Sequence, residues 1–308
     1  MAKLLEYNAT LIERIECNDG LAIFKVRPDD FAPSPGWFVP GQYLTLGLNN
    51  EDAPDLGSVR RPMSIASEPS QQDTVDFYIR YVSAPESDNP LTHLLWPLSA
   101  GDRLFVSPKG TGRFTVEHST GVDDPRVRVL VAAGTGLAPF TSMVLEQVAR
   151  NAKADLSRWG LLHAASYAAD IGYIDQLDAL VKNNGLRYAP SISRPQACPQ
   201  WDRHSGRVED FFNPERLGDT ESVLGLAPGE LNPDNAVVYI CGLNGTIANT
   251  LERLLPCGFI PNNRKIRRAL DVANETPSSF FYEPYDSTPV VEIKEAENVA
   301  RLRALMQA

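Results

Sequence analysis

The sequence predicts a two-domain protein in which an antiparallel β-barrel precedes an α/β domain built on a parallel sheet. Three observations lead to this prediction. The chain has 308 residues, and single hydrophobic cores stop growing at roughly 250–300 residues. Its first third contains short apolar segments separated by turn-forming residues. Beyond about residue 120, longer apolar runs alternate with amphipathic helical stretches.

Short strands separated by tight turns make up the first third of the chain. The turns include Pro40-Gly41 and Gly101-Asp102, which supply the fixed or positive φ angles that sharp bends need. Several short strands at this spacing are typical of an antiparallel barrel or sandwich. The expected strands are Leu21–Val26, Tyr43–Leu48, Val75–Val82 and Arg103–Val106.

The pattern changes at the polar stretch Gly121–Arg126. Val127–Ala133 is then a continuous apolar run, as in a strand that is buried on both faces. A helix, Phe140–Asn151, follows with apolar residues at helical spacing. Strands that alternate with helices indicate crossover connections and a parallel sheet. The further expected elements are strands Gly160–Ala164, Leu186–Ile192 and Ala236–Ile240, and helices Tyr173–Lys182 and Thr246–Leu255.

We therefore expect domains at residues 1–120 and 121–285, followed by a C-terminal extension at residues 286–308. Within the extension, Lys294–Met306 carries an apolar stripe that predicts a helix packed against the body of the protein. The stripe consists of Val299, Leu302, Leu305 and Met306.

Composition and charge limit the classes of function. Hydrophobic residues make up 43% of the chain and charged residues 22%, which is typical of a folded globular protein. No apolar run approaches the ~20 residues of a membrane helix, and the N-terminus lacks the regions of a signal peptide. We therefore expect a soluble cytoplasmic protein without membrane insertion. The net charge of −10 argues against nucleic acid as a partner, because phosphate binding needs a basic face.

The four cysteines lie far apart and form no Cys-x-x-Cys pair. This spacing predicts neither a zinc site nor an iron–sulfur site, so no metal is expected. Free thiols in a reducing compartment are the simplest interpretation. The cysteines are Cys17, Cys198, Cys241 and Cys257.

A glycine-rich turn follows the first buried strand of the second domain. Gly134-Thr-Gly-Leu-Ala-Pro-Phe140 places glycines at the strand end and Pro139 in the first helical turn, where proline is favoured. The helix that starts here offers free N–H groups and a positive dipole end to a pyrophosphate. A simple tight turn is the alternative interpretation.

A second glycine turn, Tyr239-Ile-Cys-Gly-Leu-Asn-Gly245, lies at the end of another buried strand. Two such turns at the carboxyl ends of parallel strands predict a ligand crevice at one edge of the sheet. Cys241 either faces that crevice or is a small buried hydrophobic residue.

In the first domain, Arg60-Arg-Pro-Met-Ser-Ile-Ala-Ser67 combines two arginines with two hydroxyls on one expected strand. An arginine fork suits a diphosphate, and a serine hydroxyl bonds ring nitrogens or carbonyls. A solvated basic edge strand is an equally good interpretation of this segment alone.

Together, in this order and to about residue 285, these motifs resemble the ferredoxin–NADP reductase family. Each motif alone is a weak or moderate signal, whereas six in the right order are a strong one. The matching segments are Phe38-Val-Pro-Gly-Gln-Tyr43, Arg61-Pro-Met-Ser64, Gly101-Asp102, Gly134-Thr-Gly-Leu-Ala-Pro-Phe140, His163-Ala-Ala-Ser-Tyr-Ala-Ala-Asp170 and Cys241-Gly242.

The resemblance implies that FAD binds to the barrel. Arg61 would hold the FAD pyrophosphate, and Ser64 would bond the isoalloxazine near N5. The turn Asn89-Pro-Leu-Thr92, with Thr92 beginning a short helix, would donate to the same pyrophosphate. The full flavin set is Arg61, Pro62, Met63, Ser64, Tyr78, Asn89, Leu91 and Thr92.

The resemblance also implies that NADP(H) binds to the second domain. Gly134, Thr135, Gly136 and Gly242 would form the dinucleotide turns, with Thr135 and Cys241 bordering the nicotinamide. Ser193-Arg194 and Arg207 favour NADP over NAD, because a guanidinium matches the 2′-phosphate in charge and shape. An ordinary surface charge is the alternative role for either arginine.

The same resemblance assigns catalytic roles to Ser64, Cys241, Glu283 and Tyr285. Glu283-Pro-Tyr285 looks like the ending of plant-type members, in which the tyrosine stacks on the flavin and the glutamate serves proton or carrier exchange. Because about 23 residues follow Tyr285, Tyr282 and Phe281 remain alternatives for the stacking role.

Two further positions depart from the family pattern. Met63 stands where the family usually has a tyrosine against the flavin ring, although a thioether also packs on aromatic faces. Ser166 stands where bacterial members often carry an arginine near the 2′-phosphate, which predicts a softer preference for NADP.

The expected activity is electron transfer between NADP(H) and ferredoxin or flavodoxin through FAD. One alternative is an NAD(P)H-dependent flavin electron-transfer subunit of a larger enzyme complex, although such subunits often carry a C-terminal cysteine cluster that this sequence lacks. Another is a non-catalytic nucleotide-binding or scaffold protein with the same fold.

Acidic carriers need a locally basic docking face. The densest basic run in the sequence is Arg264-Lys265-Ile-Arg267-Arg268. It is either the docking face or a solvated basic strand or loop.

Overall fold

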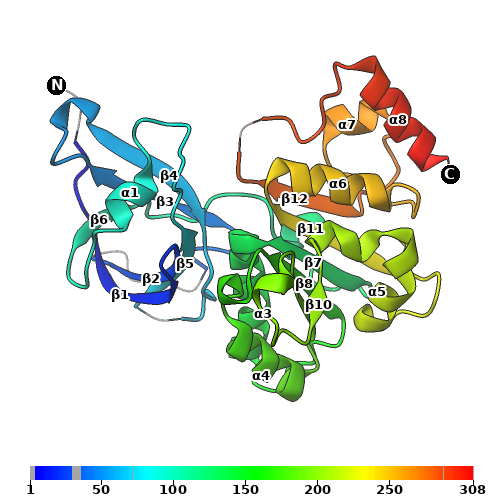
Figure 1. The fold of residues 1–308 in the computed structure, drawn as a ribbon, viewed down its shortest axis with the longest axis horizontal. Coiled ribbons are helices and arrows are strands. Elements are labelled where there is room, and N and C mark those ends of the chain that lie inside the picture. The colour runs from blue at the N-terminus through cyan, green and yellow to red at the C-terminus, as the bar shows by residue number, and fades with distance from the viewer. Residues whose placement is uncertain (1–3, 30–35, 72, 287, 308) are drawn as a thin grey trace. The chain divides into compact units, whose positions relative to one another are not determined.

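The structure is a computed structural model that describes residues 4–29, 36–71, 73–286 and 288–307. The chain divides into two compact units. The first contains Met1–Ser119 and Ala138–Ala152, and the second contains Thr120–Leu137 and Lys153–Ala308. Figure 1 labels the elements of both units.

The sheet of the first unit is antiparallel and barrel-like. Its six strands follow the order β4-β3-β6-β1-β2-β5. Ile65, just after β4, forms an isolated antiparallel bridge with Phe77 of β5. The two outer strands therefore meet at one point, and the barrel is not closed along a full seam. The strands are β1 (Ala9–Asn18), β2 (Leu21–Pro28), β3 (Tyr43–Asn49), β4 (Ser58–Ser64), β5 (Val75–Arg80) and β6 (Arg103–Val106).

Alternating side chains fill the core of this unit. On β3, Leu44 and Leu46 are fully buried, and Phe24 on β2 and Phe77 on β5 join the same cluster. The short helix α1 (Leu91–Leu95) lies against β3 and β4 (Figure 1). The unit also contains α2 (Val116–Ser119) and α3 (Ala138–Arg150).

The sheet of the second unit is parallel throughout, with the strand order β10-β9-β8-β7-β11-β12. The central strands are buried on both faces, as their continuous apolar runs predict: Val129, Leu130 and Val131 have no exposed surface. The strands are β7 (Val127–Ala133), β8 (Trp159–Ala165), β9 (Arg187–Ile192), β10 (His204–Ser205), β11 (Ala236–Gly242) and β12 (Phe280–Pro284).

Helices α6, α7 and α8 lie together on this unit (Figure 1). Arg301 of α8 pairs with Glu252 of α6, and Arg303 of α8 donates to the Ala269 carbonyl at 2.8 Å. Leu302 of α8 is buried in the core. The C-terminal helix is thus part of the packed unit. The helices are α4 (Ile174–Asn184), α5 (Leu217–Leu224), α6 (Asn244–Leu254), α7 (Arg264–Ala269) and α8 (Ala296–Met306).

The basic run at residues 264–268 is helical, so its interpretation as a strand or loop is wrong. Asn263 caps helix α7: its side-chain oxygen accepts from the backbone N–H groups of Lys265 at 2.9 Å and Ile266 at 3.2 Å. Ile266, the one apolar residue in the run with a long side chain, is buried against the core.

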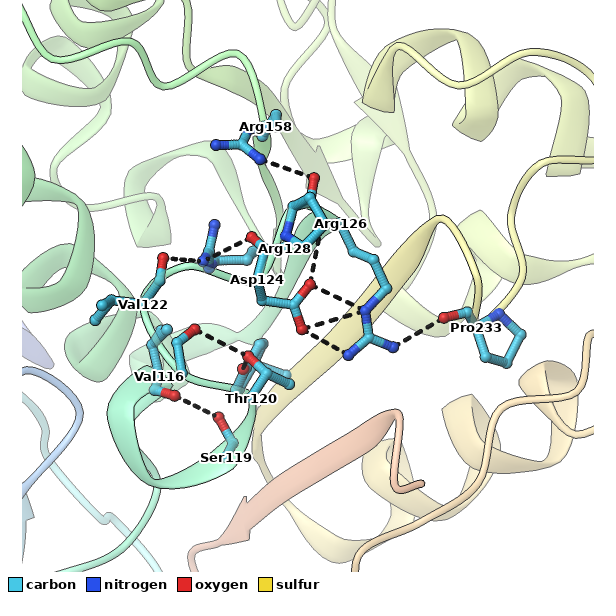
Figure 2. A network of polar contacts seen from close by, with 12 residues as sticks. Val116, Ser119, Thr120, Val122, Asp124, Arg126, Arg128, Arg158 and Pro233 are labelled. Atoms are coloured by element: carbon cyan, nitrogen blue, oxygen red, sulfur yellow. Dashed lines mark hydrogen bonds and ion pairs between the residues drawn. The ribbon is translucent and has the colours of Figure 1, made fainter. Parts of the chain in front are cut away.

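A network of polar contacts holds the segment that leads into β7 (Figure 2). Arg126 bonds the Asp124 carboxylate and donates to the Pro233 carbonyl at 2.8 Å. Arg128 donates to the carbonyl oxygens of Val122 and Asp124, at 2.9 and 3.1 Å. The polar stretch before β7 is therefore bonded to the amino end of the parallel sheet.

Among the described residues, no helix combines the length and apolar character that crossing a bilayer requires.

Candidate active site

The carboxyl ends of the parallel strands gather most of the residues expected to bind a dinucleotide. Because β7 to β12 run in one direction, the residues that follow them lie along one edge of the sheet. The chain order reverses between β7 and β11, where a crevice for a ligand is expected. Along this edge lie Ser193 and Arg194 after β9, Arg207 after β10, Gly134, Thr135 and Gly136 after β7, Cys241 and Gly242 at the end of β11, and Glu283 and Tyr285 at the end of β12.

The two positions after β7, Gly134 and Gly136, are occupied by glycine for different structural reasons. Gly134 has a φ of +55°, and a Cβ added to it would meet no atom within 4 Å. A Cβ on Gly136 would lie 2.0 Å from the carbonyl oxygen of Cys241. Gly136 therefore allows the close approach of the two turns, whereas Gly134 leaves open space above a left-handed bend. That open bend, next to the start of α3, suits the backbone approach of a ligand.

The Tyr285 hydroxyl lies between the two residues expected to border a nicotinamide. It forms side-chain hydrogen bonds with Thr135 and Cys241. The backbone N–H of Tyr285 also donates to the Gly242 carbonyl at 3.1 Å. The hydroxyl end is buried, although 43% of the whole residue is exposed. Tyr285 thus lies at the centre of the sheet edge, where the strand order leads us to expect a ligand crevice.

Cys241 and Tyr285 both stay protonated at neutral pH. Burial raises the pKa of the Cys241 thiol well above its usual range, and the charge of Glu283 adds to this rise. Burial also raises the pKa of the Tyr285 phenol well above its usual range. A thiol held in this form is not a nucleophile, so the crevice is suited to packing and orienting a ligand rather than to covalent catalysis.

His163 of β8 supports the glycine turn from inside the sheet. It is fully buried, with Nε2 at 3.2 Å from the Gly134 carbonyl oxygen and Nδ1 at 3.5 Å from the Tyr188 hydroxyl. Burial lowers the pKa of His163 to about 4. The ring is therefore neutral, and because a carbonyl only accepts, Nε2 carries the proton.

Acid is expected to destabilise the protein through His163. The unfolded chain binds a proton at this residue below about pH 6.5, whereas the folded chain does so only near pH 4. The stability that this residue contributes is fully present well above pH 6.5, and about 2–3 kcal/mol of it is lost at pH 4.5. Chemical unfolding of the wild type and His163→Gln at pH 7 and 4.5 measures this, since carboxylates common to both proteins cancel. A wild-type advantage that is equal at both pH values would contradict the assignment.

The residues expected to recognise a 2′-phosphate are neighbours in space. The backbone N–H of Ser193 donates to Ala165 O at 2.9 Å, which places the end of β9 beside the end of β8. The backbone N–H of Gly206 donates to Ile192 O at 2.9 Å, which brings Arg207 close to the end of β9. Ser193, Arg194 and Arg207 are all exposed, so their side chains are accessible to an anion.

The first unit brings together the residues expected to bind a flavin. Strand β4, which carries Arg61, Pro62, Met63 and Ser64, contacts both β5 and α1. Tyr78 lies on β5 and is buried, and Met63 packs partly against the core. The Arg61 guanidinium is exposed and donates to the Arg60 carbonyl at 2.8 Å. Its remaining donors face solvent from an edge strand, where proline is also tolerated.

Three residues near α1 form structural contacts within the protein that were not predicted from the sequence. The Asn89 side chain accepts from Asn50 at 3.1 Å and donates to the Leu56 carbonyl at 3.3 Å. The Leu91 side chain is buried in the core, so its backbone alone is free to serve a ligand. The helix begins at Leu91 rather than Thr92, and the Thr92 hydroxyl accepts from Val82 N–H at 3.3 Å.

The two alternatives to Tyr285 are engaged within the second unit. Phe281 stacks on Tyr239, with ring centres 5.4 Å apart. Tyr282 packs against Phe280 and hydrogen-bonds Asn263, and burial raises its pKa.

Comparison with known proteins agrees with this arrangement. Residues 130–252 match the family model described as Oxidoreductase NAD-binding domain. The flavodoxin/ferredoxin–NADP reductase of Shigella flexneri is 30% identical over 210 residues, which are 67% of this chain and 74% of that protein. The chain belongs to the flavodoxin/ferredoxin–NADP reductase family.

Two other relatives extend the comparison. Sulfhydrogenase 1 subunit gamma of Pyrococcus furiosus is 27% identical over 246 residues, which are 78% of this chain and 72% of that protein. A ferredoxin NADP+ reductase from Neisseria gonorrhoeae, solved with bound FAD and NADP, superposes with a TM-score of 0.70 at 20% identity, covering 91% of this chain and 98% of that one. The structural likeness confirms the two-domain fold expected for the flavodoxin/ferredoxin–NADP reductase family.

Two residues outside the expected site lie at the same sheet edge. Tyr167, after β8, contacts Arg194. Asn244, the first residue of α6, donates its side-chain amide to the Thr288 carbonyl at 2.6 Å and to the Asp286 carboxylate. Tyr167 lies within the segment His163–Asp170 and Asn244 within the second glycine turn Tyr239–Gly245, and those two segments were the available signal.

Proposed function

We propose that this protein is a flavoprotein oxidoreductase that moves electrons between NADP(H) and ferredoxin or flavodoxin through FAD. The observation that carries the proposal is the single sheet edge of the second unit that unites two glycine turns and two exposed arginines. Family membership supports the same activity, because the Shigella flexneri relative is named a flavodoxin/ferredoxin–NADP reductase.

Different residues of the second unit bind different parts of NADP(H). Gly134 and Gly136 shape a turn whose open side admits the pyrophosphate next to the N–H groups of the short 3-10 helix Gly134–Leu137. Arg194 and Arg207 supply guanidinium groups for the 2′-phosphate, with Ser193 as a further donor. Thr135 and Cys241 lie beside the nicotinamide, and Gly242 keeps the end of β11 free of a side chain.

The FAD residues lie on β4 and α1 of the first unit. The Arg61 guanidinium neutralises the pyrophosphate, the Ser64 hydroxyl bonds the flavin ring, and Met63 packs on the ring face. The first N–H groups of α1, at Leu91 and Thr92, donate to the same pyrophosphate. Bound FAD supplies the chemistry that accepts a hydride and releases electrons one at a time.

Anaerobic reduction tests the proposal directly. The purified protein is expected to be yellow, and NADPH is expected to bleach its flavin absorbance faster than NADH does. Colourless protein that takes up no FAD after reconstitution would exclude the proposed function and favour a non-catalytic nucleotide-binding role.

A second candidate is an electron-transfer subunit of a larger complex. The similarity to sulfhydrogenase 1 subunit gamma favours it, since that protein is named as a subunit. Faster bleaching by NADH than by NADPH, together with slow transfer to ferredoxin, would support this candidate over the first.

We further propose that the acidic carrier docks at helix α7. Arg264, Lys265 and Arg268 are exposed there. Arg267 instead supports the adjoining loop, donating to the Thr276 carbonyl at 2.6 Å and the Ala273 carbonyl at 3.0 Å. A recess of about 830 Å³ adjoins the helix and is lined by Arg264, Arg267 and Arg268.

Reduced carriers of this class and NADPH are intracellular, so the proposal implies a cytoplasmic location, which cell fractionation tests.

Charge reversal on α7 is expected to slow ferredoxin reduction by about tenfold. Arg264→Glu is suitable because a carboxylate is tolerated in the first turn of a helix. Lys182→Glu, on the exposed face of α4, is the matched control, since both changes lower the net charge of −10 by two. Ferredoxin and ferricyanide reduction are measured in parallel. Equal slowing in both assays, or in both variants, would exclude docking at α7.

A further inference from the structure

Tyr167 and Arg194 are held side by side by neighbouring strands. The backbone of Tyr167 is fixed by Asp170, whose carboxylate accepts the Tyr167 N–H at 3.3 Å and whose N–H donates back at 3.0 Å. The backbone N–H of Arg194 donates to Ser166 O at 3.1 Å. The two side chains therefore start from rigid positions at the ends of β8 and β9.

The Arg194 guanidinium lies on the Tyr167 ring. Its central carbon is 5.0 Å from the ring centre, and its Nη1 donates to the Tyr167 hydroxyl at 2.6 Å. In the part of the chain that the structure describes, no carboxylate forms an ion pair with Arg194. Because a guanidinium has five N–H donors, most of them remain available to an anion.

The neighbouring cations are less well placed for the same task. Arg207 is 70% exposed, and its guanidinium lies 3.8 Å from the buried Glu209 carboxylate. Ser166, which precedes Tyr167, carries no charge. Of these two arginines, Arg194 is thus the one whose guanidinium is held by an uncharged partner, which leaves its charge available to an anion.

We propose that Tyr167 is a specificity-determining residue that positions the Arg194 guanidinium for the 2′-phosphate of NADP(H). This inference rests on the proposed function. A free arginine on the surface loses rotamer freedom when it binds an anion, which weakens binding. The Tyr167 ring and hydroxyl restrict Arg194 before the ligand arrives, so less freedom is lost on binding. The remaining donors are left to form a bidentate contact with the phosphate.

Calorimetry with 2′,5′-ADP measures the effect on the flavin-loaded protein without any redox step. Tyr167→Leu removes the ring and the hydroxyl and is expected to weaken 2′,5′-ADP binding about fivefold to tenfold. Tyr167→Phe keeps the ring and is expected to weaken it about twofold. In an Arg194→Ala background, Tyr167→Leu is expected to change nothing further, because the two residues act as one unit. Binding of 5′-ADP, which lacks the 2′-phosphate, is expected to stay unchanged in every variant.

The outcomes separate this inference from the proposed function. If Arg194→Ala leaves 2′,5′-ADP binding unchanged, the assignment of the NADP(H) site itself is wrong. If Arg194→Ala weakens binding but Tyr167→Leu does not, the positioning role alone is overturned. Equal weakening of 5′-ADP and 2′,5′-ADP by Tyr167→Leu also overturns it, since Tyr167 would then contact the adenosine instead. Steady-state kinetics provide a second readout: the KM for NADPH rises in Tyr167→Leu while the KM for NADH stays constant.

Discussion

Replacing Tyr285 with serine is expected to tighten NADP+ binding by about tenfold. The Tyr285 hydroxyl bonds Thr135 and Cys241 in the crevice, so a nicotinamide that enters must break both contacts. Each contact stabilises the closed arrangement by about 1 kcal/mol. Serine cannot reach either partner, and the ligand then enters without this competition. Calorimetric titration with NADP+ measures the change.

Two controls make this expectation specific. Tyr285→Phe removes the hydroxyl but keeps the ring, so its NADP+ affinity should fall between those of the wild type and the serine variant. The fragment 2′,5′-ADP lacks the nicotinamide and should bind all three proteins equally well. An unchanged NADP+ affinity, or an equal gain for 2′,5′-ADP, would show that Tyr285 does not compete with the nicotinamide.

Gly136→Ala is expected to lower the free energy of unfolding by about 3 kcal/mol or more. The added Cβ would lie 2.0 Å from the carbonyl oxygen and 2.6 Å from the carbonyl carbon of Cys241. Both atoms belong to the backbone of a buried strand and cannot turn aside. The turn after β7 and the end of β11 must therefore separate, and the close arrangement of the two glycine turns is lost. Urea unfolding of the purified variant measures the destabilisation, and NADP+ titration measures the loss of binding.

The same turn contains the matched control. Gly134→Ala adds a Cβ that meets no atom within 4 Å, although the φ of +55° strains any residue with a side chain. Its expected cost is about 1–2 kcal/mol, from backbone conformation alone. If the two alanine variants unfold at the same urea concentration, the close approach at Gly136 is not what requires a glycine there.

Much of the second unit follows from the order of residues along the chain. Val127–Ala133 is strand β7 in the structure, with the bounds that its apolar run predicts. Pro139 lies in the first turn of α3, as its lack of an N–H suggests. Once the strands are known to be parallel, their following residues must meet at one edge. That the glycine turns lie at the same sheet edge as Ser193, Arg194 and Arg207 was therefore predictable. It follows from the local sequence signals and from the rule that parallel strands end at one edge of the sheet.

Contacts between side chains distant in sequence were not predictable in this way. Arg194 lies on Tyr167 because the sheet register places the ends of β8 and β9 together, and no local pattern records that register. His163 reads as one more residue of an apolar strand, and only its bond to Gly134 O reveals its supporting role.

Short helices also could not be predicted from the sequence. Helix α7 has six residues, too few for an apolar period to appear, and its cap at Asn263 resembles many loop asparagines. The buried Leu91 side chain and the Asn89 side chain, which bonds Asn50 and Leu56, show a similar limit. A family motif indicates where a ligand binds, but it does not distinguish side chains that face the ligand from those that support the backbone.

The continuation of the chain past Tyr285 changes the kind of charged group that follows β12. A tyrosine at a chain terminus would carry a free main-chain carboxylate. Here Tyr285 ends in an amide instead, and the acidic group that follows, Asp286, is turned toward the Asn244 amide and the Thr288 N–H, the latter at 3.0 Å. The appended segment therefore replaces a free main-chain carboxylate by a side-chain carboxylate that is held in place by hydrogen bonds from Asn244 and Thr288.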